Sequence, residues 1–291
     1  MIPLPRALVL ALGFYFGIPV VQISGTLQGQ TAPTDSILAI AHTLFTEASI
    51  LANQGHQDEA ESKLQRVLDI REKALGLDHP DVALALHNLG FIYNAQGRYA
   101  EAEPLLRRAL IIREAALGPQ HLEVALTLNS LAFTYGVRSR YEEAEPLYER
   151  ALAIDEIVLG PNHLEVAHVL SNLGMLYDDL ARYIEARSVY ERVLAIRETV
   201  LGLGHPDVAD ALINLASLYH HQELYAEAIP LYRRSLDIRK VEFGPEHSDT
   251  GLALENLILA CELFFALPYI AQEQQSITAP ESMTVLCRPS P

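Results

Sequence analysis

The hydrophobic residues of this chain recur with two superimposed periods. Locally, apolar positions lie three and four residues apart, which indicates amphipathic helices. Over a longer range the whole pattern returns every 42 residues, marked by Leu-Gly pairs that end at Gly76, Gly118, Gly160 and Gly202 and by Phe243-Gly244 in the same register. A unit of this size that is copied several times predicts an array in which each copy stacks on its neighbours.

Each copy is predicted to be a helical hairpin. In residues 77–118, two apolar stripes flank a break at Gly97-Arg98: Leu86, Leu89 and Tyr93 before it, Ala102, Leu106, Ala109 and Leu110 after it. Two positions carry small residues: Gly90, Ala132, Gly174 and Ala216 on the first helix, and Ala102, Ala144, Ala186 and Ala228 on the second. Helices approach closely only where side chains are small, so these positions predict the crossing point. We expect Gly174→Leu to cost about 1 to 3 kcal/mol through overpacking.

The connectors between copies contain helix stop and start signals. Gly76 suits a left-handed C′ position, and Pro80 or Pro206 suits the first turn of the following helix. A histidine also recurs in every connector, at His79, His121, His163, His205 and His247. Since each histidine belongs to a different repeat, we expect these side chains to close the turn and not to bind a metal.

The pattern Leu86-x2-Leu89-Gly90-x2-Tyr93 followed by Ala102-x3-Leu106 resembles the tetratricopeptide repeat. The 42-residue spacing and the connector Leu-Gly-x-x-His-Pro are similar to the kinesin light chain type of that repeat. The resemblance covers residues from about 35 to about 265. It implies an all-α fold, a right-handed α-solenoid of stacked helical hairpins (a TPR superhelix), and a scaffold that recruits protein partners.

The register divides the chain into three parts. Residues 1–32 form a leader and linker, residues 33–266 form the repeat array, and residues 267–291 form a C-terminal cap or flexible tail. Within the array we expect five hairpins and one half-repeat, at residues 36–76, 77–118, 119–160, 161–202, 203–244 and 245–266. The apolar end of the half-repeat is covered either by residues 267–275 folding back or by a second chain, since terminal repeats usually need a polar cap.

One face of each first helix is the expected binding site, because this face lines the groove in proteins that the repeat resembles. The predicted groove residues are Asn88, Phe91, Asn129, Phe133, Asn172, Met175, Asn214, Ser217 and Asn256. Asparagine offers two donors and an acceptor, so a row of them is able to hold the backbone of an extended peptide. The alternative is that these amides bond a neighbouring helix and that the phenylalanine and methionine side chains are ordinary packing.

Charge and missing motifs limit the other functions. With 37 acidic and 21 basic residues the net charge is −16, which disfavours nucleic acid and anionic membranes. The sequence has no phosphate-binding loop, nucleophile elbow or H-E-x-x-H pair, so we expect no enzymatic activity, no catalytic residue, no cofactor and no metal. The predicted partner is a protein or peptide of unknown identity. The alternative function is a structural subunit that self-associates through its apolar C-terminal end.

The N-terminal residues bear on localisation. Arg6 precedes an apolar run from Ala7 to Val21, which resembles a secretory signal peptide. We expect a periplasmic or extracellular protein, or one anchored to a membrane by this segment, and a cytoplasmic protein if residues 7–23 are not a targeting signal. Cys261 and Cys287 match no disulfide framework or zinc motif, so we expect one packed and one loose thiol and leave the redox compartment open.

Overall fold

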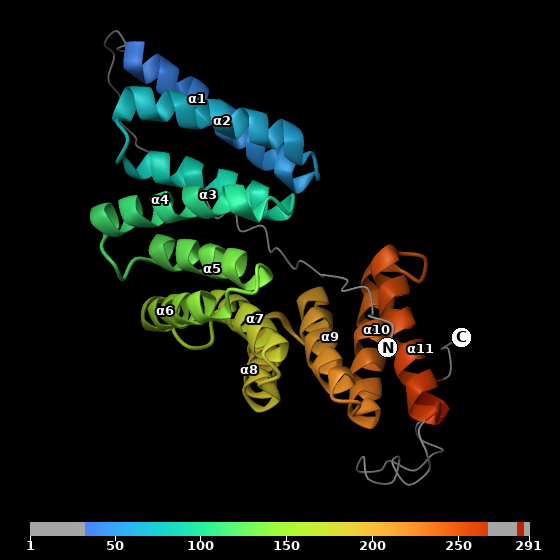
Figure 1. Cartoon of the computed structure of the whole chain (residues 1–291). Coiled ribbons are helices and arrows are strands. Elements are labelled where there is room, and N and C mark those ends of the chain that lie inside the picture. The colour runs from blue at the N-terminus through green and yellow to red at the C-terminus, as the bar shows by residue number, and fades with distance from the viewer. Residues whose placement is uncertain (1–32, 267–283, 288–291) are drawn as a thin grey trace. The chain divides into compact units, whose positions relative to one another are not determined.

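The computed structural model describes residues 33–266 and 284–287 of the chain. Every regular element in these ranges is helical, which confirms the all-α prediction (Figure 1). The labelled helices are α1 (Pro33–Asn53), α2 (Gln57–Leu75), α3 (Pro80–Ala95), α4 (Tyr99–Leu117), α5 (Leu122–Val137), α6 (Tyr141–Leu159), α7 (Leu164–Asp179), α8 (Tyr183–Leu201), α9 (Pro206–His221), α10 (Tyr225–Phe243) and α11 (Ser248–Ala266).

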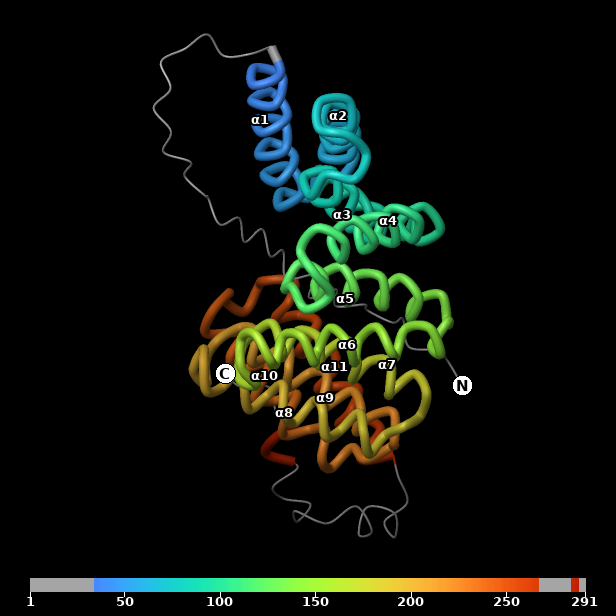
Figure 2. Tube along the Cα trace, turned by 90° about the vertical axis from the view of Figure 1, so that its left-hand side faces the viewer, coloured from blue at the N-terminus to red at the C-terminus, as the bar shows by residue number. Residues whose placement is uncertain are grey.

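The structure consists of two compact units, and the division between Leu147 and Tyr148 falls inside α6. In the first unit the hairpins α1–α2 and α3–α4 follow one another in chain order, and α5 packs on α4. Figure 2 shows α1 and α2 side by side. In the second unit the hairpins are α7–α8 and α9–α10, with α11 packed on α10. Consecutive packing of hairpins confirms the predicted solenoid type of fold within each unit.

The two helices of a hairpin meet at the predicted small residues. A Cβ atom added at Gly174 would lie 2.5 Å from Cε1 of Tyr190, and one added at Gly90 would lie 2.8 Å from Cγ of Leu106. The facing alanines Ala102 and Ala186 are fully buried. Glycine at these two positions lets a large side chain of the second helix pack directly against the backbone of the first.

The turn inside each hairpin needs one residue with positive φ, and the connector between hairpins needs another. The intra-hairpin residues are Gly55, Gly97, Ser139, Ala181 and Glu223, with φ between 56° and 81°. In the connector, Gly76 has φ 89° and ψ 165°. The positive φ agrees with the expectation, but this ψ is not that of the left-handed helix. Gly76 instead occupies a region that is essentially open to glycine alone, and the chain leaves the helix extended.

Histidines close the connectors, as expected. In all five, Nδ1 accepts a hydrogen bond from the backbone N–H two residues later, over 3.1 Å in His79, His121, His163 and His205 and 3.2 Å in His247. Each imidazole therefore acts as an N-cap for the following helix. Pro80 and Pro206 stand at the start of α3 and α9, where no N–H donor is needed.

Buried arginines join successive hairpins. Arg71, Arg113, Arg197 and Arg239 are at most 8% exposed, and each donates through Nη1 to a backbone carbonyl at the start of the next hairpin. The acceptors are the carbonyls of Asp81, Glu123, Asp207 and Asp249, at 2.8 to 3.1 Å. Burial lowers the pKa of Arg113 to about 10, partly offset by the nearby Glu123 carboxylate. The guanidinium stays charged at neutral pH and fixes the junction.

The remaining junction carries Asp155 at the position of these arginines. Its side chain is 5% exposed, and burial together with the Glu165 carboxylate raises the pKa of Asp155 to about 7. Burial likewise raises the pKa of Glu165. At the other junctions an arginine donates hydrogen bonds at any physiological pH, whereas Asp155 is able to donate one only when its carboxyl group is protonated.

Both cysteines are joined in a disulfide, so the prediction of two free thiols is wrong. Cys261 of α11 is bonded to Cys287, with Cα atoms 5.9 Å apart. The helical period does not predict which residues outside the array contact it. The pairing of Cys261 with Cys287, 26 residues further along the chain, was therefore not predicted.

Other predictions fall outside the described residues. These are the leader of residues 1–32, with its apolar run, and the cap expected at residues 267–275. Among the helices that the structure describes, the stretch Thr34–Asn53 is long and apolar enough to cross a membrane by length and composition. The first helix of a repeat array passes the same test, so length and composition do not assign α1 to a membrane.

Candidate binding surface

The predicted groove residues lie on the first helices of successive hairpins. Asn88 and Phe91 lie on α3, Phe133 on α5, Asn172 and Met175 on α7, Asn214 and Ser217 on α9, and Asn256 on α11, all half-buried. Asn129 of α5 differs, because its side chain is only 5% exposed and belongs to the interior. We call the eight half-buried residues the first-helix surface.

Some of these polar groups are engaged within the protein. The amide Nδ2 of Asn88 donates to the carbonyl of Leu84 in its own helix at 2.8 Å. The hydroxyls of Ser217 and Tyr232 lie 3.2 Å apart, which ties α9 to α10. An asparagine that bonds its own helix keeps its side chain on the helix face and leaves it accessible from one side. These contacts position the polar groups but reduce their capacity for a ligand.

Polar contacts also link neighbouring first helices. In the first unit, Asn94 Nδ2 of α3 donates to Thr134 Oγ1 of α5 at 2.9 Å, and both side chains are buried. In the second unit, His221 Nδ1 of α9 lies 2.8 Å from Asp178 Oδ2 of α7. Neither pair was predicted, because the residue types of these pairs are not repeated in the other copies. Asn94 and Asp178 occupy the same repeat position, and His220 and Glu262 stand there in later copies, so an alignment of the copies shows a mostly polar position inside the first helices.

The C-terminal ends of α3, α5 and α7 are held by stacked arginines. The guanidinium carbons of Arg98, Arg140 and Arg182 lie 4.0, 4.2 and 4.2 Å from the ring centroids of Tyr93, Tyr135 and Tyr177. Arg98 also pairs with Glu101 and, at 2.6 Å, with Glu61 of the preceding hairpin. The hydrogen bond from Arg98 lowers the pKa of Glu101. These cations thus serve the packing of the helix ends.

The electrostatics of the surface are set by neutral and acidic groups. Burial, reinforced by the nearby Arg197, lowers the pKa of His168 to about 4, so this imidazole is neutral at physiological pH. Asp210 forms a 2.6 Å ion pair with Arg239. Among the described residues, no group of three or more His, Cys, Asp or Glu side chains is placed to hold a metal ion.

Arginines on the second helices bridge neighbouring hairpins. Arg108 pairs with Glu72 at 2.5 Å and Arg192 with Glu156 at 2.6 Å. Arg234 forms the corresponding pair with Glu198 at 2.5 Å. These residues therefore belong to the packing of the array and are not part of the candidate surface.

Comparisons with known proteins bear on the fold and the family. The tetratricopeptide repeat family matches residues 39–115, 81–156, 123–199 and 207–263. No curated protein matches the chain.

Solved structures with the same arrangement include BtubC (BKLC) from P. vanneervenii, which is 26% identical over 72% of this chain and 83% of that one, with a TM-score of 0.61. The kinesin light chain-type protein of Podosopora anserina, with nearly identical TPR-like repeats, is 25% identical over 71% and 98%, with a TM-score of 0.59. The apo form of RapI shares the fold at 14% identity over 85% and 81%, with a TM-score of 0.59. The 42-residue hairpins, their small-residue contacts and the extent of the family match show that this chain belongs to the tetratricopeptide repeat family.

Proposed function

We propose that this protein is a non-enzymatic scaffold whose first-helix surface binds an extended segment of a partner protein. Tetratricopeptide repeats generally mediate interactions between proteins, and this supports the class of function. The observation that carries the finer proposal is the recurrence of half-buried asparagines, Asn172, Asn214 and Asn256, at the same position of α7, α9 and α11.

The chemistry of the surface suits a peptide backbone. An amide side chain donates to a carbonyl and accepts from an N–H, whatever the side chains of the bound segment are. Met175, on the same helix as Asn172, adds apolar contact, and methionine adapts to different shapes. We expect an affinity in the micromolar range, about −8 kcal/mol. The net charge of −16 favours the approach of basic segments.

The proposal is tested by capturing partners from the native source with the full chain and identifying them by mass spectrometry. The variant Asn172→Ala/Asn214→Ala is expected to lose the captured proteins at least tenfold, since each lost amide leaves a polar group of the partner unpaired. Asn162→Ala is the matched control, because Asn162 is an exposed asparagine in a connector. Equal capture by the double variant and wild type contradicts peptide binding by this surface.

We also propose that the protein works outside the cytoplasm. The apolar run Ala7–Val21 supports export, and the disulfide between Cys261 and Cys287 supports an oxidising compartment, because such bonds are rare in the reducing cytosol. Fractionation of the native cells checks this. Recovery of the protein in the cytosolic fraction, with both thiols free, contradicts it.

Self-association is the second candidate function, and a specific observation favours it. Leu252, Ile258 and Phe265 of α11 are 41 to 48% exposed, so the last helix presents apolar side chains at the end of the array. The molar mass of the full chain in solution separates the two functions. A monomer at micromolar concentration excludes the self-associating subunit and leaves the peptide-binding scaffold.

A further inference from the structure

The last helix departs from the repeat at three positions through which the other first helices dock their own partner helix. Cys261 stands where the other copies have Tyr93, Tyr135, Tyr177 and Tyr219. Ile258 stands where they have the small residues Gly90, Ala132, Gly174 and Ala216. Phe265 stands where they have the turn residues Gly97, Ser139, Ala181 and Glu223, and it lies inside the helix.

These substitutions remove the usual docking site for a second helix. A large side chain at Ile258 blocks the close approach that Gly174 permits in α7, where Tyr190 lies against the glycine. Loss of the left-handed turn lets α11 run for 19 residues, against 16 in α7 and α9. Ile258 and Phe265 are 46% and 48% exposed as a result. The substitutions at Ile258 and Phe265 therefore oppose docking of a second helix in the way that the other repeats dock theirs.

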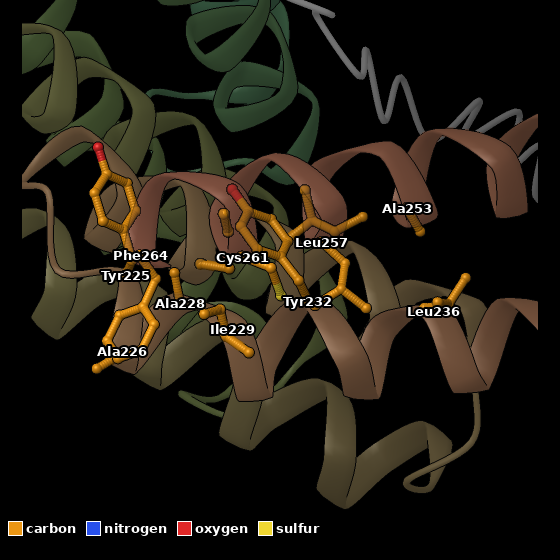
Figure 3. Close-up of a cluster of buried hydrophobic side chains, with 13 residues drawn as sticks. Tyr225, Ala226, Ala228, Ile229, Tyr232, Leu236, Ala253, Leu257, Cys261 and Phe264 are labelled. Atoms are coloured by element: carbon orange, nitrogen blue, oxygen red, sulfur yellow. The ribbon is translucent and has the colours of Figure 1, made fainter. Parts of the chain in front are cut away.

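The disulfide shows which segment reaches this face. Cys261 belongs to the buried cluster between α10 and α11, and Figure 3 shows it in line with Leu257 and Phe264 on the side of α11 that faces Tyr232 of α10. The bond to Cys287 brings the C-terminal residues to the same cluster, and Leu286 and Cys287 pack against it half-buried. One covalent and one apolar contact thus fix the segment at the end of the array.

We propose that residues 284–287 form a disulfide-fastened cap that takes the place of the second helix in the last repeat. The cap covers part of the cluster around Cys261 with Leu286 and holds residues 284–287 against α11. This role of the C-terminal segment is separate from peptide binding by the first-helix surface. Its occupant is this chain's own C-terminal segment and not a second copy.

Closing the cap is an oxidation. The two thiols lose two protons and two electrons, the S–S bond forms, and a disulfide oxidant is reduced to a dithiol. A dithiol reductant reverses the reaction and frees the segment. The crosslink closes a loop of 26 residues, which restricts the unfolded chain.

The test measures hydrogen exchange of the α11 amides in the oxidised full chain, with the α9 amides as internal reference. Cys287→Ser is expected to speed exchange in α11 about a hundredfold, from the loop entropy that the crosslink removes. Leu286→Asp, which keeps both cysteines, is expected to speed it about tenfold by removing the buried leucine. Val285→Asp is the matched control, because Val285 is 64% exposed, and it is expected to change nothing.

Three results would overturn the cap. The first is an oxidised chain whose intact mass shows both thiols free. The second is equal exchange in α11 for wild type, Cys287→Ser and Leu286→Asp. The third is an oxidised wild type that is dimeric with α11 protected only in the dimer, because a second copy then covers the face. Loss of partner capture in the asparagine variants is independent of all three, so the cap and the binding proposal fail separately.

Discussion

Four junctions between hairpins hold a buried arginine, and one holds a buried aspartate. Arg113 donates to the Glu123 carbonyl at 3.1 Å and to Thr127 Oγ1 at 2.5 Å, with 1% of its surface exposed. Asp155 occupies the corresponding place with 5% exposed. The backbone of the repeat therefore accommodates either residue, but only the arginine supplies a permanent donor.

The comparison shows that the apolar packing between hairpins does not depend on the charge of the junction residue. The apolar cluster around Val166 on α7 includes Leu152 of the preceding second helix, just as the cluster around Val82 on α3 includes Leu68, so the same apolar packing occurs beside Asp155 and beside Arg71. The junction residue decides how that packing depends on pH. An arginine keeps its charge, whereas the raised pKa of Asp155 makes one junction sensitive to protonation near neutrality.

The largest expected effect is this pH dependence. The pKa of Asp155 is about 7 in the folded chain, well above that of an unfolded aspartate near 4. Between these values the unfolded chain binds fewer protons, so the free energy of unfolding falls as pH rises and is constant above about pH 7. Three pKa units correspond to at most about 4 kcal/mol. Urea titrations from pH 4 to 8 measure it.

The control is Asp155→Asn, which keeps the shape of the side chain and does not titrate. We expect the difference in unfolding free energy between this variant and wild type to grow from pH 4 to pH 7. A difference that stays constant over this range would show that folding does not raise the pKa of Asp155.

The next effect is the loss of an arginine junction. Arg113→Ala is expected to cost about 3 kcal/mol, because the buried Thr127 hydroxyl loses its donor, the Glu123 carbonyl keeps only its bond from Thr127, and the packing of the side chain is lost. Arg107→Ala, at an exposed position of the same helix, gives the matched control with little change. Equal stability of the two variants would show that the buried arginine contributes nothing to stacking.

Converting the aspartate junction to the common type is expected to stabilise the protein. Asp155→Arg supplies a donor for the Glu165 carbonyl and removes a carboxyl group that is costly to ionise. We expect a gain of about 2 kcal/mol at pH 8, less at pH 5 where Asp155 is protonated. Chemical denaturation at both pH values tests this, and a loss of stability at pH 8 would mean that the site is shaped for aspartate.

The smallest expected effect concerns the close contact between the two helices of one hairpin. Gly174→Ala is expected to cost about 1 kcal/mol, because Tyr190 is 3% exposed and cannot move away from the new methyl group. Gly136→Ala is the control, since a Cβ atom there meets nothing within 4 Å, and we expect a small gain. A gain in both variants would refute close packing at Gly174.

The repeat made most of the fold predictable. The positions of Gly90 and Gly174, the capping role of His79 and its equivalents, and the hairpins themselves all follow from a period that five copies share. The junction arginines also follow the 42-residue spacing, so they were predictable from it. Asp155 is the exception in the series. Pro104, Pro146 and Pro230 recur at this spacing as well and lie within continuous helices.

Features that occur once were not predictable from the period. The disulfide depends on a return of the chain after α11, and the pair of His221 and Asp178 depends on two residues that appear in single copies. Asn129 comes one residue before the position of the other asparagines, and this shift along the helix points its side chain into the interior. Periodicity therefore locates the candidate surface but does not determine which of its side chains remain accessible.

The most direct test of the central claim, that partners bind on the first helices, is site-specific photo-crosslinking in the native source. A photoreactive residue replaces Phe133 or Met175 on first helices, or Ile111 or Ile184 on second helices, where 66% and 77% of the side chain is exposed. We predict crosslinked partner proteins from the Phe133 and Met175 positions and none from the other two. Crosslinks confined to Ile111 and Ile184 would contradict the account.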